Sequence, residues 1–144
     1  MLNKILRKRK FSESNFITLF LAITYLENKV DYINRFRLQE KLANFYDAEN
    51  TIFEDIDLKE ENDKKYLSIE SGFTYAIAYG LLVTIHDNTK DLIYIINMSE
   101  KSATKVLNEY DPEIVNAMTK LVNDVFTKDE EKVPQRINTK INES

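Results

Sequence analysis

Cysteine is absent from the 144 residues of this chain, and glycine and histidine are scarce. Without cysteine the protein forms no disulfide, holds no metal through thiolates and has no cysteine nucleophile. Such a chain fits a reducing compartment, and we expect a cytoplasmic protein. The two glycines, Gly72 and Gly80, are too few for a glycine-rich turn that cradles phosphate, which excludes P-loop and Rossmann nucleotide sites.

Long hydrophobic runs are also missing. The longest, at residues 16–26, has eleven residues and includes two threonines and a tyrosine. A bilayer span requires about 20 apolar residues, so this run predicts a buried core helix and no membrane association. The basic start of the chain resembles that of a signal peptide, but residues 12–15 are polar and no small-residue cleavage site follows the run.

The charges are spread unevenly along a chain whose net charge is -4. Five basic residues and no acid occur within residues 1–10, whereas residues 47–63 hold eight acids against a single lysine. We expect residues 1–11 to form a basic N-terminal arm. The candidates for weak contact with nucleic acid are Arg7, Lys8, Arg9 and Lys10 of this arm, with Arg35 and Arg37 on the second predicted helix.

The composition predicts one globular domain with a polar tail. Hydrophobic residues make up 43% and aromatic residues 11% of the chain, which is enough for a single core over residues 12–127. Residues 128–144 are rich in charged and amide side chains, and their only large apolar residues are Val133 and two isoleucines. This segment cannot bury enough apolar surface to fold alone, so we interpret it as a flexible tail or as an arm laid on a partner.

Helical periodicity dominates the first half. Ser12 or Ser14 can cap a central helix that is apolar on most sides and runs to residue 26. A short strand or turn follows at residues 30–33, and Asn34 can cap a second helix. Residues 47–66 have no clear period, so we expect a loop with one short helical piece from Thr51. The apolar stripe of the second helix is Leu38, Leu42, Phe45 and Tyr46.

A third helix is expected from Ser68, with Gly80 as the place for it to end. The period then changes to two in residues 82–86 and 92–97, which predicts a β-hairpin with a loop of several residues.

Two more helices follow the hairpin. Ser99 can cap the first, and Asp111-Pro112 is a strong start signal for the second, because proline is favoured at the first helical position. The order of elements predicts a mainly α fold with a small β-hairpin: a winged-helix-like domain with a C-terminal helical extension.

No catalytic or metal site assembles from these residues. His86 lies beside Asp87, but no serine elbow accompanies the pair. The acids after Asp55 resemble a calcium loop until the positions are counted: position 6 is Glu60 where glycine is required, and position 12 is Tyr66 where glutamate is required. We therefore expect no enzyme, no cofactor, no metal and no small-molecule substrate.

The helix before the hairpin would enter the DNA major groove in a winged-helix protein, yet it contains no basic residue. This composition argues against sequence-specific DNA reading through that helix. Tyr75 and Tyr79, four residues apart, suit either a protein interface or closure of the core. The candidate partner-binding residues are Tyr75 and Tyr79, with Asp55, Asp57, Glu60 and Glu61 of the acidic segment.

Three stretches carry a resemblance to a known family: residues 16–26 (FITLFLAITYL), 76–83 (AIAYGLLV) and 94–102 (YIINMSEKS). With the order of elements, they resemble the small middle component of bacterial ABC-three-component and Lamassu-type anti-phage systems. The resemblance implies a winged-helix-like accessory subunit that bridges a large SMC-like ATPase and an effector. It brings no catalytic residues.

Three functions remain after these exclusions. The first is a non-enzymatic adaptor in a bacterial multi-protein assembly, with protein partners and non-specific DNA contact at most through the basic arm. The second is a winged-helix regulator that binds DNA. The third is a phage or plasmid inhibitor that acts through its acidic segment on a basic groove of its target.

Overall fold

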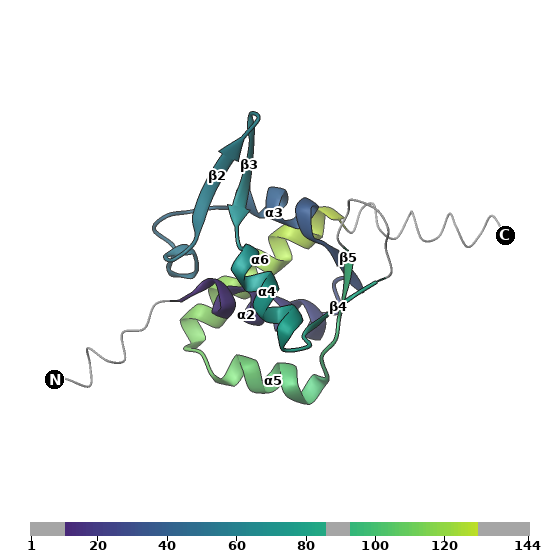
Figure 1. The fold of residues 1–144 in the computed structure, drawn as a ribbon. Helices are drawn as coiled ribbons and strands as arrows, with labels where there is room; N and C mark the ends of the chain where they lie inside the picture. The colour runs from purple at the N-terminus through teal and green to yellow at the C-terminus, as the bar shows by residue number, and fades with distance from the viewer. Residues whose placement is uncertain (1–10, 86–92, 130–144) are drawn as a thin grey trace.

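The computed structural model describes residues 11–85 and 93–129, which form a mixed α/β fold. Arg7, Lys8, Arg9, Lys10, His86, Asp87 and the tail beyond residue 129 lie outside the described residues. Helices pack around one central helix, and a small antiparallel sheet closes one end (Figure 1). The described helices are α2 (Glu13–Leu26), α3 (Arg35–Ala43), α4 (Glu70–Ala78), α5 (Glu100–Asn108) and α6 (Pro112–Asp129), with a 3-10 turn, η1, at Thr51–Phe53.

Helix α2 forms the centre of the molecule, as its apolar sequence predicts. Ser12 caps it by accepting a hydrogen bond from the backbone N–H of Asn15. Helices α4, α5 and α6 all contact it, so eight of its residues are buried. Thr24 is buried among them and donates its hydroxyl to the Phe20 carbonyl at 2.7 Å. Phe11, which the sequence placed at the end of the basic arm, is also buried, against Phe16 and Tyr110.

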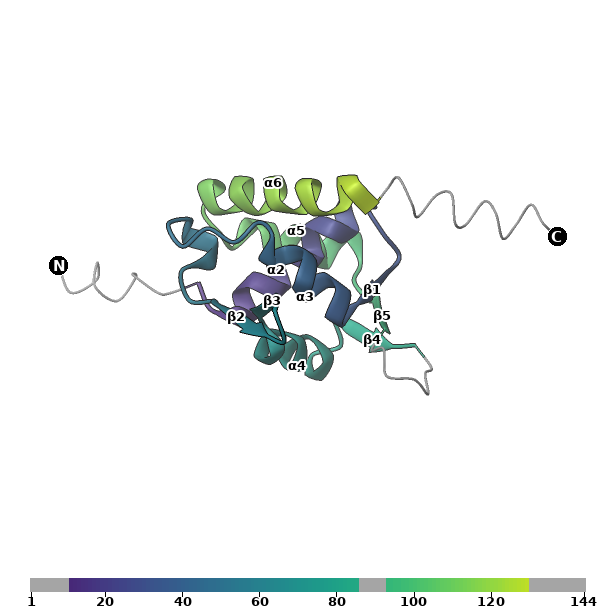
Figure 2. The same ribbon diagram turned by 90° about the horizontal axis from the view of Figure 1, so that it is seen from above.

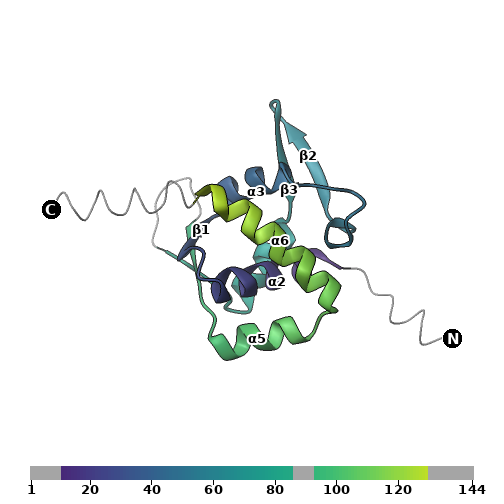
Figure 3. The same cartoon turned by 180° about the vertical axis from the view of Figure 1, so that it is seen from behind.

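Helix α6 runs along one side of the molecule from end to end (Figure 2) and crosses α2 (Figure 3). It begins at the predicted Asp111-Pro112 signal, and the Asp111 carbonyl accepts the backbone N–H of Ile114 at 2.9 Å. Its buried stripe faces the core, where Phe126 packs on Phe20 with ring centroids 5.8 Å apart. The buried residues of this stripe are Met118, Leu121, Val122, Val125 and Phe126.

The predicted hairpin is confirmed and is part of a three-stranded sheet. Strand β4 (Leu82–Thr84) pairs antiparallel with β5 (Ile93–Ile96), and β1 (Tyr32–Asn34) pairs with the other edge of β5. The sheet order is therefore β1-β5-β4. Ile33 and Tyr94 lie opposite each other and are buried on the inner side.

A second hairpin interrupts the segment that the sequence predicted to be mostly loop. Strands β2 (Asp57–Glu61) and β3 (Lys64–Ser68) pair antiparallel, and the hairpin extends away from the helices (Figure 1). Asn62 and Asp63 join the strands, both with positive φ, as the central residues of a type I′ turn require. The prediction that this segment is mostly loop is therefore wrong, and the expected single hairpin is joined by a second one in a mixed α/β fold. The 3-10 turn from Thr51 agrees with the predicted short helical piece.

Two predicted helix boundaries also shift. Ser68 does not open α4, because it is the last residue of β3 and the helix begins at Glu70. Helix α3 is capped by the Asn34 side chain as predicted, but it ends at Ala43, before Phe45 and Tyr46. Gly80, with φ +77, follows the end of α4, because glycine adopts this left-handed conformation without strain. No helix in residues 11–85 and 93–129 is both long and apolar enough to cross a bilayer.

Candidate protein-interaction surface

Beyond Glu70 in its first turn, α4 contains no charged residue, and its exposed positions carry aromatic and aliphatic groups. Tyr79 is 70% exposed and Ile77 is 39% exposed. The ring of half-buried Tyr75 packs against that of Tyr79 with centroids 4.5 Å apart and ring planes tilted by 34°, and neither tyrosine is among the buried core residues. Phe73 and Ala76 hold the opposite side of the helix in the core. We name the outward residues the α4 face: Ser71, Thr74, Tyr75, Ile77, Ala78 and Tyr79.

The outer side of the three-stranded sheet exposes a second set of apolar groups. Tyr32 lies opposite Ile95 in the β1–β5 register, and Val83 lies opposite Ile95 in the β4–β5 register. Their exposed fractions are 43%, 46% and 46%. Residues directly opposite on adjacent strands share one face, so these three side chains form a continuous row across the sheet. We call Tyr32, Ile95 and Val83 the sheet row.

A hydrogen-bonded junction fixes the start of α4 against α3 and β3. The amide of buried Gln39 donates to the Leu67 carbonyl at 2.9 Å and to Glu70 Oε2 at 3.2 Å. Ser68 Oγ donates to the other oxygen of Glu70 at 3.0 Å. Arg35 Nε donates to Gln39 Oε1 at 3.4 Å. Because these bonds join three elements, they position α4 and thereby its outward face.

The same junction determines the acidity of Glu70. Burial alone would raise the pKa of this carboxyl. Hydrogen bonds from its own backbone N–H, from Ser68 and from Gln39 outweigh burial, and the Arg35 charge adds to them, so the pKa of Glu70 is below its usual value.

Glu70 is therefore expected to make the fold sensitive to acid. With a lower pKa in the folded than in the unfolded chain, the carboxylate stabilises the fold above the usual value of 4.5, and this stabilisation is lost as the pH falls through the folded pKa. Glu70→Gln should lower the melting temperature most at neutral pH, through the loss of about 1 kcal/mol of charged hydrogen bonding. Thermal unfolding at neutral pH and at about pH 3.5 measures the difference between the two proteins. A difference that does not shrink in acid would contradict this assignment.

The structure places the predicted acidic residues on an exposed hairpin whose second strand carries lysines. Glu60 lies opposite Lys65, and Glu61 lies opposite Lys64. Asp57 is exposed at the start of the same strand, and Asp55 is exposed just before it. Both belong to a different part of the chain from Tyr75 and Tyr79, which lie in and directly after α4. Opposite charges on facing positions offset each other. The segment is therefore less strongly acidic as a surface than its sequence predicts.

The two predicted basic residues of α3 differ in their surroundings. The Arg35 guanidinium lies 5.5 Å from the centre of the Phe73 ring and also reaches the Phe36 ring. Arg35 is half-buried, and its guanidinium is engaged with neighbouring side chains of α3 and α4. Arg37 is exposed.

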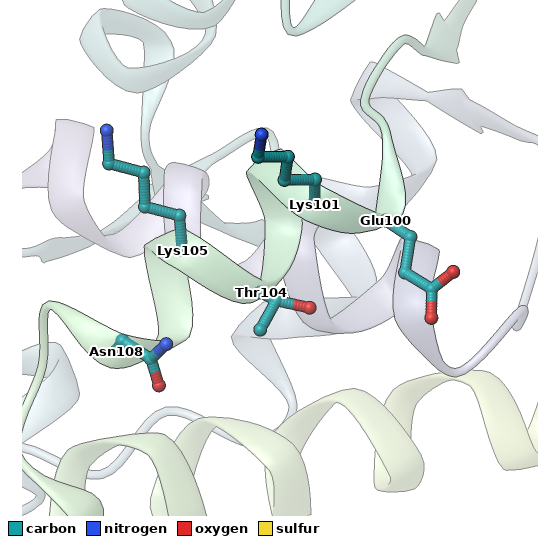
Figure 4. A pocket seen from close by; sticks show the side chains of 5 residues that line it. All are labelled: Glu100, Lys101, Thr104, Lys105 and Asn108. Atoms are coloured by element: carbon teal, nitrogen blue, oxygen red, sulfur yellow. The ribbon is translucent and has the colours of Figure 1, made fainter.

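Two hollows lie on the described surface. One, of about 640 Å³, is bounded by side chains of α5 alone; Lys101 and Lys105 point to one side of the helix, and Thr104 and Asn108 point elsewhere (Figure 4). The other, of about 440 Å³, lies between α3 and the β2–β3 hairpin. Its lining residues are Phe36, Gln39, Glu40, Glu61, Asn62, Lys64, Tyr66 and Glu70.

The second hollow carries charges of both signs, with Lys64 Nζ 3.9 Å from a Glu40 oxygen. Within residues 11–85 and 93–129, no group of three or more acidic or histidine side chains is arranged to hold a metal ion.

The sheet row is the part of the surface that sequence reasoning missed. Ile93, Tyr94, Ile95 and Ile96 are apolar on both sides of the strand, so the pattern gives a strand without showing which side faces the core. An uninterrupted apolar strand in a small sheet was the available signal for an exposed apolar side. No protein-family model, curated protein or solved structure matches this chain, so its function has to be argued from its own residues.

Proposed function

We propose that this protein is a non-enzymatic adaptor that binds another protein through the α4 face. The observation that carries the proposal is the exposure of Tyr79 and Ile77 at the C-terminal end of a helix whose only charged residue, Glu70, lies in its first turn. Tyrosine is enriched at protein interfaces because its ring gains from burial while its hydroxyl keeps a polar partner. An uncharged, partly aromatic face is suited to a protein partner.

A winged-helix-like topology is the second part of the proposal. Helix α2, strand β1, helix α3, helix α4 and the β4–β5 pair follow in that order, and the first strand joins the sheet beside the last. The β2–β3 hairpin is then an insertion between the second and third helices. In this topology α4 occupies the position of the groove-reading helix. Its lack of cations favours a protein over phosphate as its partner.

The resemblance to the middle component of ABC-three-component systems suggests who the partners are. We propose a cytoplasmic bacterial assembly in which the chain connects an SMC-like ATPase to an effector.

The structure offers less support for the two alternative functions, a DNA-binding regulator and an inhibitor. A DNA-binding regulator would have to bind through surfaces other than α4. An inhibitor acting through the acidic segment would present glutamates that already face Lys64 and Lys65.

The proposal is tested by co-expressing the chain with the products of adjacent reading frames and measuring the affinity of the complex. Ile77→Asp and Tyr79→Asp should each weaken binding by about 30-fold, the equivalent of a 2 kcal/mol hot spot. Lys101→Asp, on exposed α5, is the matched control and should leave the affinity unchanged. Melting temperatures of all three variants should stay close to wild type, because the replaced side chains lie outside the core.

Two results would overturn the proposal. One is a chain that stays a monodisperse monomer with every product tested. The other is a complex whose affinity neither α4 substitution alters.

A further inference from the structure

The sheet row is an apolar surface separate from the α4 face, and part of this chain can cover it. Tyr32, Ile95 and Val83 come from three adjacent strands that lie about 4.8 Å apart, so the row spans roughly 10 Å. Ile93 and Ile85 continue the same side of the sheet along β5 and beyond β4, and both are partly exposed. The covering segment therefore needs several apolar side chains on one side.

The C-terminal end of α6 lies on the same side of the molecule as this sheet. Val125 and Phe126 are buried in the core, which fixes the last turns of α6. Figures 2 and 3 show this end of the helix on the same side of the molecule as β1. The described chain begins at the opposite end of α6, because Phe11 packs on Tyr110, two residues before that helix begins.

Residues 130–144 have the required sequence. Val133, Ile137 and Ile141 recur at intervals of four. In an extended segment residues at even intervals lie on one side, and in a helix residues four apart also share a side. The polar residues between them would then face water. The segment contains three acids and three basic residues, so its net charge does not oppose docking.

The segment is also long enough. Ile141 is twelve residues beyond Asp129, a distance of about 40 Å for an extended chain at roughly 3.3 Å per residue. This reach exceeds the roughly 10 Å width of the row several times. We propose that residues 130–144 pack on the sheet row of the same chain through Val133, Ile137 and Ile141.

A spin label tests the proposal cleanly because the full chain has no cysteine. Thr139→Cys carries a nitroxide between the apolar positions, and amide signals are recorded by NMR. The amide signals of Tyr32, Val83 and Ile95 should lose most of their intensity and recover on reduction of the label. Those of Lys101 and Lys105 on α5 serve as the internal control and should not change.

A matched variant and a mixed sample complete the test. Adding Ile137→Ser and Ile141→Ser to the labelled protein should restore the three sheet signals, because the apolar contacts are lost while the label stays in place. A mixture of spin-labelled protein with unlabelled, isotope-enriched protein should show no loss. Signal loss that appears in the mixture would assign the segment to a second copy and overturn the proposal. Unchanged sheet signals in the singly labelled protein would overturn it as well.

Discussion

Phe20→Ala is expected to lower the free energy of unfolding by about 3–5 kcal/mol, the usual cost of removing a buried phenylalanine. The Phe20 ring is fully buried, stacks on Phe16 with centroids 6.1 Å apart and packs on Phe126 of α6. Its loss leaves a cavity where the central helix meets the longest one. Domains of this size are stable by only about 5–15 kcal/mol, so the variant should be partly unfolded at modest urea concentrations.

The measurement is urea unfolding followed by far-ultraviolet circular dichroism, since the chain has no tryptophan. Tyr79→Ala is the matched control: it also removes an aromatic ring, but from a side chain that is 70% exposed. This control should stay within about 0.5 kcal/mol of wild type. Equal losses for the two variants would show that α2 and α6 do not meet through Phe20.

Gly72→Val is expected to cost about 3 kcal/mol, at the upper end of the range for overpacking. A Cβ at Gly72 would lie 2.7 Å from the Glu13 carbonyl oxygen and 2.7 Å from Ile17 Cγ1. The Ile17 side chain can move, but the carbonyl belongs to the backbone of α2. The same close approach lets the Ser71 backbone N–H donate to Glu13 Oε1 at 3.0 Å. A side chain at Gly72 would therefore push α4 away from α2.

Gly72→Ala makes the sharper test because two effects oppose each other. In an exposed helix the change from glycine to alanine stabilises by up to about 1 kcal/mol. At this crossing the steric cost should exceed that gain, and the melting temperature should fall. Ser71→Ala, at the exposed neighbouring position, should leave it nearly unchanged. A higher melting temperature for Gly72→Ala would mean that the helices separate without cost.

Local signals in the sequence predicted the parts of the fold that depend on local chemistry. Ser12, Asn34 and Ser99 each cap the helix expected of them, because a cap requires only a side-chain oxygen and a backbone N–H three residues later. The β2–β3 hairpin was missed because its strands carry no local sequence signal. Its strands are exposed on both sides over most of their length, so they show no alternation of polar and apolar residues. Only the Asn62-Asp63 pair indicated the turn.

The candidate surface was predicted only in part. The tyrosines of α4 and the lack of charge around them are visible in the sequence, although the choice between core and interface required the exposed fraction of Tyr79. The sheet row required pairing between β1 and β5, which are about sixty residues apart. Local patterns cannot supply such a contact. The contact between Arg35 and Phe73 of α4 likewise joins residues that are distant in the sequence.

The length of α6 sets the distance between the two ends of the described chain. Its 18 residues span about 27 Å at 1.5 Å per residue. Phe11 is held beside Tyr110 at one end, and Asp129 closes the other, so the described chain enters and leaves at points separated by this helix. Two proteins that bound the chain next to these two points would be separated by about the length of α6. Inserting one helical turn into α6 would lengthen the separation by about 5.4 Å.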